Sequence, residues 1–86
     1  LLGACGIDPV AGITAQWADD AAVKRLVAAR SGRVAVAADR SKLGTAAPFA
    51  VMGLAACDQL VIEAGTDPAM REALAAAGPE LVDVEV

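Results

Sequence analysis

The sequence predicts an α/β domain with a mainly parallel four-stranded sheet and flanking helices. Two kinds of segment alternate along the chain: short apolar runs of strand length, and capped runs whose apolar residues recur at helical spacing. Strands separated by helices imply right-handed crossovers and therefore parallel pairing. The expected order is strand, helix, strand, an irregular stretch, strand, helix and strand.

The first half of the chain is expected to hold two strands and one helix. Residues 1–4 form a short apolar strand, ended by a glycine and an X-Pro step, and a loop then continues to about residue 18. Residues 19–30 carry aspartates in the first turn and an arginine in the last, as an amphipathic helix does. Residues 34–38 are a continuous apolar run, typical of a strand covered on both faces. The apolar positions of the helix are Ala22, Val23, Leu26, Val27 and Ala29.

The second half repeats the alternation after an irregular stretch. Residues 49–52 suggest a short extended piece and residues 53–57 a helical turn, and residues 59–62 are a strand of the buried type. Asp67 followed by Pro68 predicts the start of a helix that runs to residue 77, where Gly and Pro stop it. Residues 81–86 alternate apolar and acidic side chains, which indicates a half-exposed edge strand.

Length and composition predict one small domain that leaves apolar surface uncovered. The chain has 86 residues, 57% of them hydrophobic, but only one Trp and one Phe. A core of small side chains buries little area per residue, so we expect homo-oligomerisation or cover from further polypeptide. The chain starts without Met inside an apparent strand, and we expect it to be a segment of a longer protein.

Charge and residue types exclude several classes of function. The formal net charge is −4 and no basic run exceeds Lys24-Arg25, so this segment by itself is not a nucleic-acid-binding surface. No apolar run approaches the ~20 residues of a membrane span. The absence of His and of a Cys-x-x-Cys pair excludes zinc sites and His-based catalysis, and no cofactor is expected. Cys5 and Cys57 lie in apolar surroundings, as reduced core thiols of a cytoplasmic protein do.

The residues most suggestive of chemistry follow the apolar run 34–38. A carboxylate, a guanidinium, a hydroxyl and an ammonium come directly after it, and a second carboxylate ends the strand 59–62. Ligands of open α/β sheets bind at the carboxyl ends of the strands. A cation with fixed backbone N–H donors is the chemistry of a phosphate site, although the loop could be only a solvated connection. The candidate ligand-binding residues here are Asp39, Arg40, Ser41, Lys42, Gly44 and Glu63.

Four short segments in register resemble the carboxyl-terminal half of the sensor domain of DeoR-family transcriptional repressors. They read GIT at residues 12–14, DAAVKR at 20–25, ADRSKLG at 38–44 and CDQLVIE at 57–63. Asp39-x-Ser41-Lys42-x-Gly44 is the most specific of them. The chain departs from the family pattern at three positions: Cys5 replaces a usual Asp, Arg40 a usual Ser and Glu63 a usual Asp.

The resemblance implies a larger Rossmann-like domain related in fold to ribose-5-phosphate isomerase and glucosamine-6-phosphate isomerase. The family's sensor domains bind phosphorylated sugars, and a winged helix-turn-helix, expected upstream of Leu1, reads DNA. Residues 1–86 would then be the carboxyl-terminal portion of the effector-binding domain. The resemblance adds Gly6 and Thr14 to the candidate ligand-binding residues.

Two other classes of function stay open at this point. A sugar-phosphate isomerase of the same fold needs a general base and acid, and Asp8, Asp39 and Glu63 are the carboxylates near the expected site. In a structural oligomerisation module, the exposed apolar residues would form the interface, and the loop after residues 34–38 would bind no ligand. We expect a sensor, not an enzyme, and assign no catalytic residue.

Overall fold

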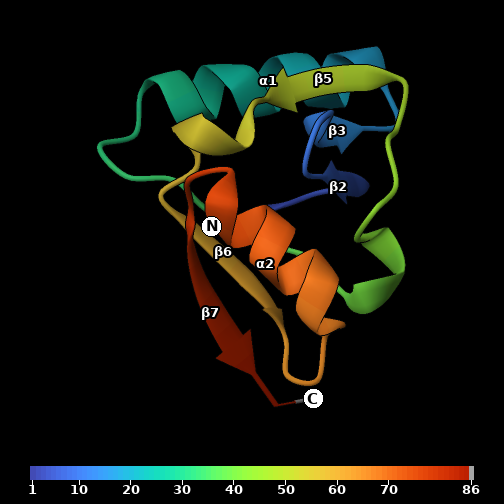
Figure 1. Cartoon of the computed structure of the whole chain (residues 1–86). Helices are drawn as coiled ribbons and strands as arrows, with labels where there is room; N and C mark the ends of the chain where they lie inside the picture. The colour runs from blue at the N-terminus through green and yellow to red at the C-terminus, as the bar shows by residue number, and fades with distance from the viewer. Residues whose placement is uncertain (86) are drawn as a thin grey trace.

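The computed structural model describes residues 1–85 and has two sheets and two helices (Figure 1). The strands are β1 (Leu2–Gly3), β2 (Gly6–Asp8), β3 (Gly12–Ala15), β4 (Ala35–Ala37), β5 (Phe49–Met52), β6 (Gln59–Glu63) and β7 (Glu80–Val84). The helices are α1 (Ala18–Ala29) and α2 (Pro68–Ala76), with two short 3-10 turns, η1 (Arg40–Lys42) and η2 (Leu54–Ala56). Neither helix is long and apolar enough to cross a membrane.

Sheet A confirms the predicted four-stranded parallel sheet. Its order is β1-β4-β6-β7, and every neighbouring pair is parallel. The register aligns Leu2 with Val36 and Val36 with Leu60, so apolar side chains from adjacent strands share one face. The strand predicted over residues 81–86 is β7, at the edge of this sheet, and Val86 lies outside the described residues.

Sheet B replaces most of the loop that the sequence predicts between residues 5 and 18. β2 and β3 form an antiparallel hairpin, and β5 pairs with β3 to complete three strands. In the hairpin turn the Asp8 carboxylate accepts from the backbone N–H groups of Val10 and Ala11, each at 2.8 Å. Gly12 has φ 78°, a conformation that favours glycine. The expectation of a long loop is therefore wrong, whereas the extended piece at residues 49–52 is confirmed as β5.

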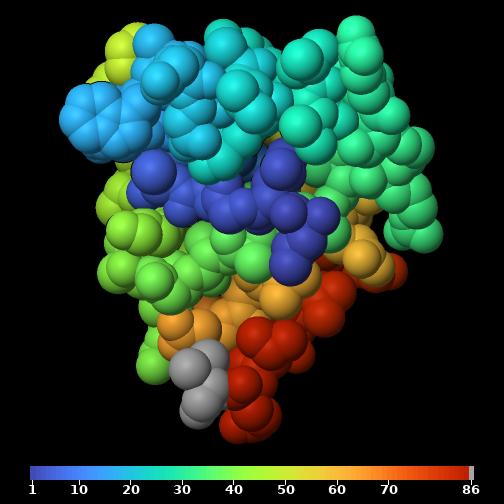
Figure 2. Space-filling model, turned by 180° about the vertical axis from the view of Figure 1, so that it is seen from behind, coloured from blue at the N-terminus to red at the C-terminus, as the bar shows by residue number. Residues whose placement is uncertain are grey.

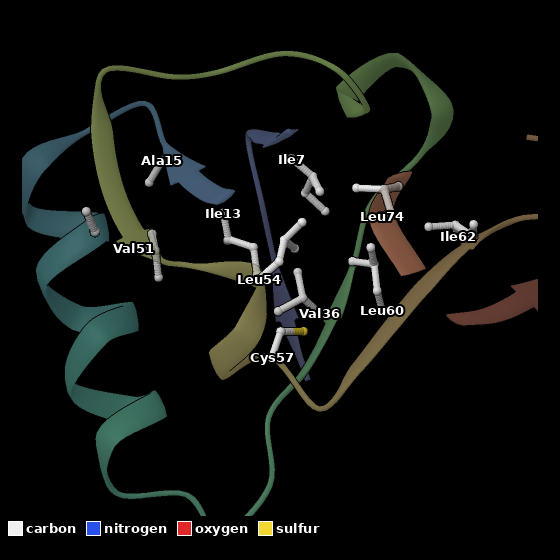
Figure 3. Packing of buried hydrophobic residues seen from close by; sticks show 11 residues of the cluster. Ile7, Ile13, Ala15, Val36, Val51, Leu54, Cys57, Leu60, Ile62 and Leu74 are labelled. Carbon is white, nitrogen blue, oxygen red and sulfur yellow. The ribbon is translucent and has the colours of Figure 1, made fainter. Parts of the chain in front are cut away.

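A single apolar core joins the two sheets (Figure 3). Val36, Leu60 and Ile62 project from sheet A, and Ile7 and Ile13 meet them from sheet B. Sheet B, both helices and the η2 turn supply the rest of the core. These residues are Ala15 and Val51 from sheet B, Ala21 from α1, Leu74 from α2, Leu54 from η2, and Cys57 directly after η2. Nearly all are aliphatic, so the packing of small and branched side chains holds the sheets together.

Both cysteines are free thiols, as predicted. Cys57 belongs to the core and its thiol contacts the backbone oxygen of Gln59 at 3.1 Å. Burial raises the pKa of the Cys57 thiol, which keeps it protonated and poorly nucleophilic. Cys5 is half-buried.

The face of sheet A opposite the core is only partly covered, which corrects the expectation that residues 34–38 are buried on both faces. In β4, Val36 is fully buried, but Ala35 and Ala37 on either side of it are half-buried. β6 repeats this pattern, with Leu60 and Ile62 buried and Val61 between them half-buried. A continuous run of small apolar residues thus forms a strand with one packed face.

Helix α1 lies on sheet B, in contact with β3 and β5. Its inward face carries Ala21, which is fully buried, and Ala28, which is half-buried. These small side chains let the helix approach the sheet closely. The predicted apolar positions lie elsewhere on the helix, and Val23, Leu26 and Val27 are all exposed.

Helix α2 begins and ends as the sequence predicts. The Asp67 carboxylate accepts from the Met70 backbone N–H at 3.2 Å, and Pro68 occupies the first helical position. Leu74 is buried against sheet A, and Figure 1 shows the helix running across β6. An ion pair between Arg71 and Asp83 joins the helix to β7.

Candidate functional site

An open pocket of about 410 Å³ lies at the carboxyl edge of sheet A. The last residues of all four parallel strands line it, together with the loop that follows β4. Parallel strands carry their carboxyl ends to one edge, and open α/β sheets bind ligands there. The lining residues are Gly3, Ala4, Ala37, Ala38, Asp39, Lys42, Val61, Glu63 and Val84.

Three of the sequence-predicted residues, Asp39, Lys42 and Glu63, meet in this pocket. Asp39 and Lys42 come from the loop after β4, and Glu63 ends the neighbouring parallel strand β6. Among the described residues that line the pocket, Lys42 is the only basic one, and its side chain is half-buried. The pocket therefore offers one ammonium group beside two carboxylates, with walls of small side chains.

The Asp39 carboxylate organises the loop by capping the η1 turn. Its Oδ1 accepts from the backbone N–H of Ser41 at 3.1 Å and from the Ser41 hydroxyl. The next two N–H groups are also engaged, because Lys42 donates to the Asp39 carbonyl at 3.1 Å and Leu43 to that of Arg40 at 3.2 Å. Ser41 thus helps to shape the loop but does not line the pocket.

Gly44 fixes the far end of the loop against sheet B. Its N–H donates to the Ile7 carbonyl at 2.7 Å, and Leu43 forms a single β-bridge with the same residue. Gly44 has φ 79°, and an added Cβ would lie 3.0 Å from the Met70 methyl carbon. The backbone N–H groups of residues 41–44 all donate within the protein, so Lys42 supplies the available positive charge at the pocket.

Glu63 anchors the start of the η1 turn to the end of β6. Its Oε1 accepts from the Arg40 backbone N–H at 3.2 Å, and its Oε2 pairs with the Arg40 guanidinium at 3.1 Å. Arg40 does not line the main pocket. It lines a second pocket of about 230 Å³ with Leu43, Thr66, Asp67 and Met70, near the start of α2.

The capping interaction predicts a pH response at Asp39. The hydrogen bond from the Ser41 hydroxyl lowers the pKa of the Asp39 carboxyl below its ordinary value, and the charge of Lys42 lowers it further. A carboxyl whose pKa is lower in the folded state stabilises the fold above its unfolded pKa, and this contribution is lost as the pH falls through the folded pKa. We expect Ser41→Ala to raise the pKa of Asp39 towards the ordinary value, as followed by NMR titration of the carboxyl carbon. An unchanged pKa in Ser41→Ala would show that the Ser41 hydroxyl does not donate to Asp39.

Gly6 and Thr14 lie in sheet B and do not line the pocket. The buried Thr14 hydroxyl donates to the Gly6 carbonyl at 3.2 Å and accepts from the Ala47 N–H at 2.8 Å. An added Cβ on Gly6 would meet the Thr45 carbonyl oxygen at 2.6 Å. The two residues join the hairpin to the segment before β5, and this arrangement gives them a structural role.

Replacing Thr14 tests that structural role. Thr14→Val keeps the volume but leaves the Ala47 N–H without its acceptor, and we expect the free energy of unfolding to fall by about 1–3 kcal/mol. Urea titrations of the variant and the original chain measure this change. Ligand affinity should stay within about threefold of the original, since such a change corresponds to less than about 1 kcal/mol. Lost ligand binding at unchanged stability would place Thr14 in the binding site instead.

Asp8, a third carboxylate considered for catalysis, is also outside the pocket. It closes the β2–β3 hairpin turn, and the backbone hydrogen bonds from Ala11 and then Val10 lower the pKa of its carboxyl group. Asp39 and Glu63 are therefore the carboxylates that share the pocket.

The pocket walls are the part of the site that motif reasoning missed. Gly3, Ala37 and Val61 are register neighbours on the partly covered face of sheet A, and they line the pocket beside the charged residues. The signal in the sequence is small residues at the carboxyl ends of two adjacent strands, Gly3-Ala4 and Ala37-Ala38. Small residues leave room for a ligand where larger side chains would fill the space.

Comparison with known proteins assigns the chain to a family. A protein-family model described as the DeoR C terminal sensor domain matches residues 1–64. That range contains sheet B, α1, the loop after β4, β6 and every lining residue of the pocket except Val84. No curated protein and no solved structure matches the chain. Because the family model covers most of the sequence, the chain belongs to the DeoR C-terminal sensor domains, which are regulatory effector-sensing domains.

Proposed function

We propose that the pocket at the carboxyl edge of sheet A binds a phosphorylated sugar or a related metabolite. The observation that carries this proposal is the position of Lys42, the single basic residue among the described lining residues, beside the free ends of four parallel strands. Its ammonium would bind the phosphate as a point charge. Asp39 has a second carboxylate oxygen beyond the one that caps η1, and this oxygen would accept from a sugar hydroxyl.

The regulatory part of the proposal concerns the parent protein. Residues 1–86 would be the carboxyl-terminal portion of the effector domain in a cytoplasmic transcriptional repressor that self-associates, and a separate helix-turn-helix would bind DNA. Effector binding and DNA binding are then thermodynamically coupled. An effector that binds more tightly to the DNA-free state therefore lowers the affinity of the repressor for its operator. This segment carries a net charge of −4, which fits a sensing role better than direct contact with DNA.

Calorimetric titration tests the proposed ligand class. Aldose and ketose phosphates are titrated into the chain, with the matching unphosphorylated sugars and inorganic phosphate as controls. We expect at least one phosphorylated sugar to bind about tenfold or more tightly than its unphosphorylated counterpart, because one charged hydrogen bond contributes about 1.5–3 kcal/mol. Equal affinities within each pair would contradict phosphate recognition.

An isomerase is the alternative, because two carboxylates share the pocket. Both carboxylates already have partners: Asp39 accepts from Ser41, and Glu63 accepts from Arg40. Among the described lining residues, both Glu63 oxygens are engaged and Asp39 keeps Oδ2 free, so the pocket offers a single free carboxylate where isomerisation needs a general base and a general acid. Aldose–ketose interconversion by the chain, abolished in Glu63→Gln, would favour the enzyme over the sensor.

A further inference from the structure

Helix α1 presents an apolar stripe to solvent on the side away from sheet B. Val23, Leu26 and Val27 are 59%, 54% and 45% exposed, and Trp17, which precedes the helix, is 66% exposed. Figure 2 shows the light-blue to cyan segment of α1 forming one end of the molecule, open to solvent in that view. Soluble proteins seldom expose several large apolar side chains side by side, so this stripe marks an interaction surface.

Val23 and Leu26 belong to the ridge of the helix opposite its buried face, whereas Val27 lies to one side of that ridge. At about 100° of rotation per residue, Asp19, Val23, Leu26 and Arg30 fall within a narrow sector. The inward residues Ala21 and Ala28 lie on the other side of the helix. The spacing along the ridge is four, three and four residues, which is the repeat of a helix that packs along a second helix.

The charges at the two ends of the ridge are opposite. Asp19 is in the first turn and Arg30 caps the last, and both residues are exposed. Among residues 1–85 neither of them belongs to an ion pair. The ridge is therefore acidic at one end, apolar in the middle and basic at the other.

The four-three-four spacing is the same in both directions along the helix. The ridge therefore matches the ridge of a second copy that runs antiparallel to it. Against an antiparallel copy, Asp19 lies opposite Arg30, and Val23 lies opposite Leu26. A two-fold axis at the middle of the helix repeats each contact, giving two ion pairs around four apolar side chains. A parallel arrangement would instead place equal charges opposite each other.

We propose that this ridge, made of Asp19, Val23, Leu26 and Arg30, is a homodimer interface in which α1 packs antiparallel against α1 of a second copy. A second copy fits this ridge because the charges at the two ends are complementary only in the antiparallel orientation. Trp17, the only Trp in the chain, is the exposed N-cap residue of α1, so its emission is a probe of this end of the helix. The ridge is on α1, which covers sheet B, and none of its residues lines the ligand pocket, so this proposal does not depend on the ligand.

Sedimentation equilibrium of the chain and Trp17 emission against concentration test this dimer. We expect a monomer–dimer equilibrium with a blue-shifted emission in the dimer. Leu26→Gln, a change at an exposed position, should raise the dissociation constant at least about tenfold and leave the circular dichroism spectrum unchanged. A chain that stays monomeric at millimolar concentration, or a dimer that Leu26→Gln leaves intact, would overturn the proposal.

Charge reversal tests the antiparallel pairing. Asp19→Arg and Arg30→Asp each place equal charges opposite each other, so each variant alone should dimerise about tenfold or more weakly than the original chain. Mixing the two variants brings opposite charges together at both sites and should restore dimerisation to within about threefold, as a heterodimer. The double variant Asp19→Arg/Arg30→Asp should also dimerise.

Circular dichroism of each variant checks that the helix itself persists, because Asp19→Arg also loses a favourable interaction with the helix dipole. If the folded single variants do not recover dimerisation on mixing, the antiparallel α1 interface is wrong. A dimer that is equally strong in all the variants would place the interface on another surface.

Discussion

Lys42→Ala is expected to weaken binding of the phosphorylated effector by roughly tenfold to more than a hundredfold. The substitution removes the only basic group among the described lining residues of the pocket, and a hydrogen bond to a charged group contributes about 1.5–3 kcal/mol. Lys42 belongs to no ion pair within residues 1–85 and acts on Asp39 only through its charge, so the melting temperature should fall by little. Calorimetric titrations and thermal melts of both chains measure the two effects.

Arg33→Ala is the matched control for the loss of positive charge. Arg33 is exposed and precedes the opposite end of the strand β4, outside the lining of the pocket. Arg33→Ala should leave effector affinity within about twofold of the original chain, because salt screens the field of a charge this far from the pocket. Equal losses of affinity in both variants would indicate a general charge effect, and a lowered melting temperature with unchanged affinity in Lys42→Ala would indicate a structural lysine. A parent repressor that carries Lys42→Ala should remain bound to its operator when inducer is added.

Leu60→Ala is expected to cost about 2–5 kcal/mol of unfolding free energy, enough to unfold much of so small a domain. Leu60 is fully buried in the middle of sheet A, where Figure 3 shows it among core side chains from both sheets. Its truncation leaves a cavity at the junction of the sheets. Urea or thermal unfolding followed by circular dichroism measures the loss.

Val61→Ala is the control on the next residue of the same strand. Val61 points to the partly covered face and is half-buried, so its truncation should cost less than about 1.5 kcal/mol. Equal costs for the two substitutions would contradict the one-sided packing of sheet A.

The parallel sheet was predictable because each of its signals is local. Asp67 and Pro68 mark the start of α2, and the apolar run before Asp39 marks the end of β4. Helices α1 and α2 precede β4 and β7 and predict parallel crossovers there, whereas the parallel pair β4–β6, which brings Asp39 and Glu63 to one edge, is connected through η1, β5 and η2. The position of the candidate site at that edge therefore came from the order of the elements.

Sheet B was not predictable from local signals. Its first two strands are three and four residues long, with Pro9 in the turn between them and Gly12 at the start of the second. The hairpin is completed by β5, more than thirty residues further along, and by the Thr14 hydroxyl that binds Ala47. Long-range pairing and buried side-chain hydrogen bonds leave no periodic trace in the sequence.

The orientation of α1 and the hydrogen bonds of the η1 loop also could not be predicted from the sequence. Hydrophobic periodicity favours the Val23 and Leu26 face as the packed one, but the smaller Ala21 face fits closer to sheet B. In the loop, Ser41 has the N–H and hydroxyl expected of a phosphate donor, and both are directed to Asp39. Which donors remain for a ligand depends on the folded geometry of the loop.

An NMR titration of the isotope-labelled chain with the tightest-binding phosphorylated sugar shows directly whether the loop around Lys42 forms the effector site. We expect backbone resonances to shift at the pocket, foremost at Ala38, Asp39 and Lys42, while those of the hairpin residues Gly6 and Thr14 stay in place. Shifts confined to the hairpin or to the second pocket at Thr66 and Met70, with none at Lys42, would contradict this expectation.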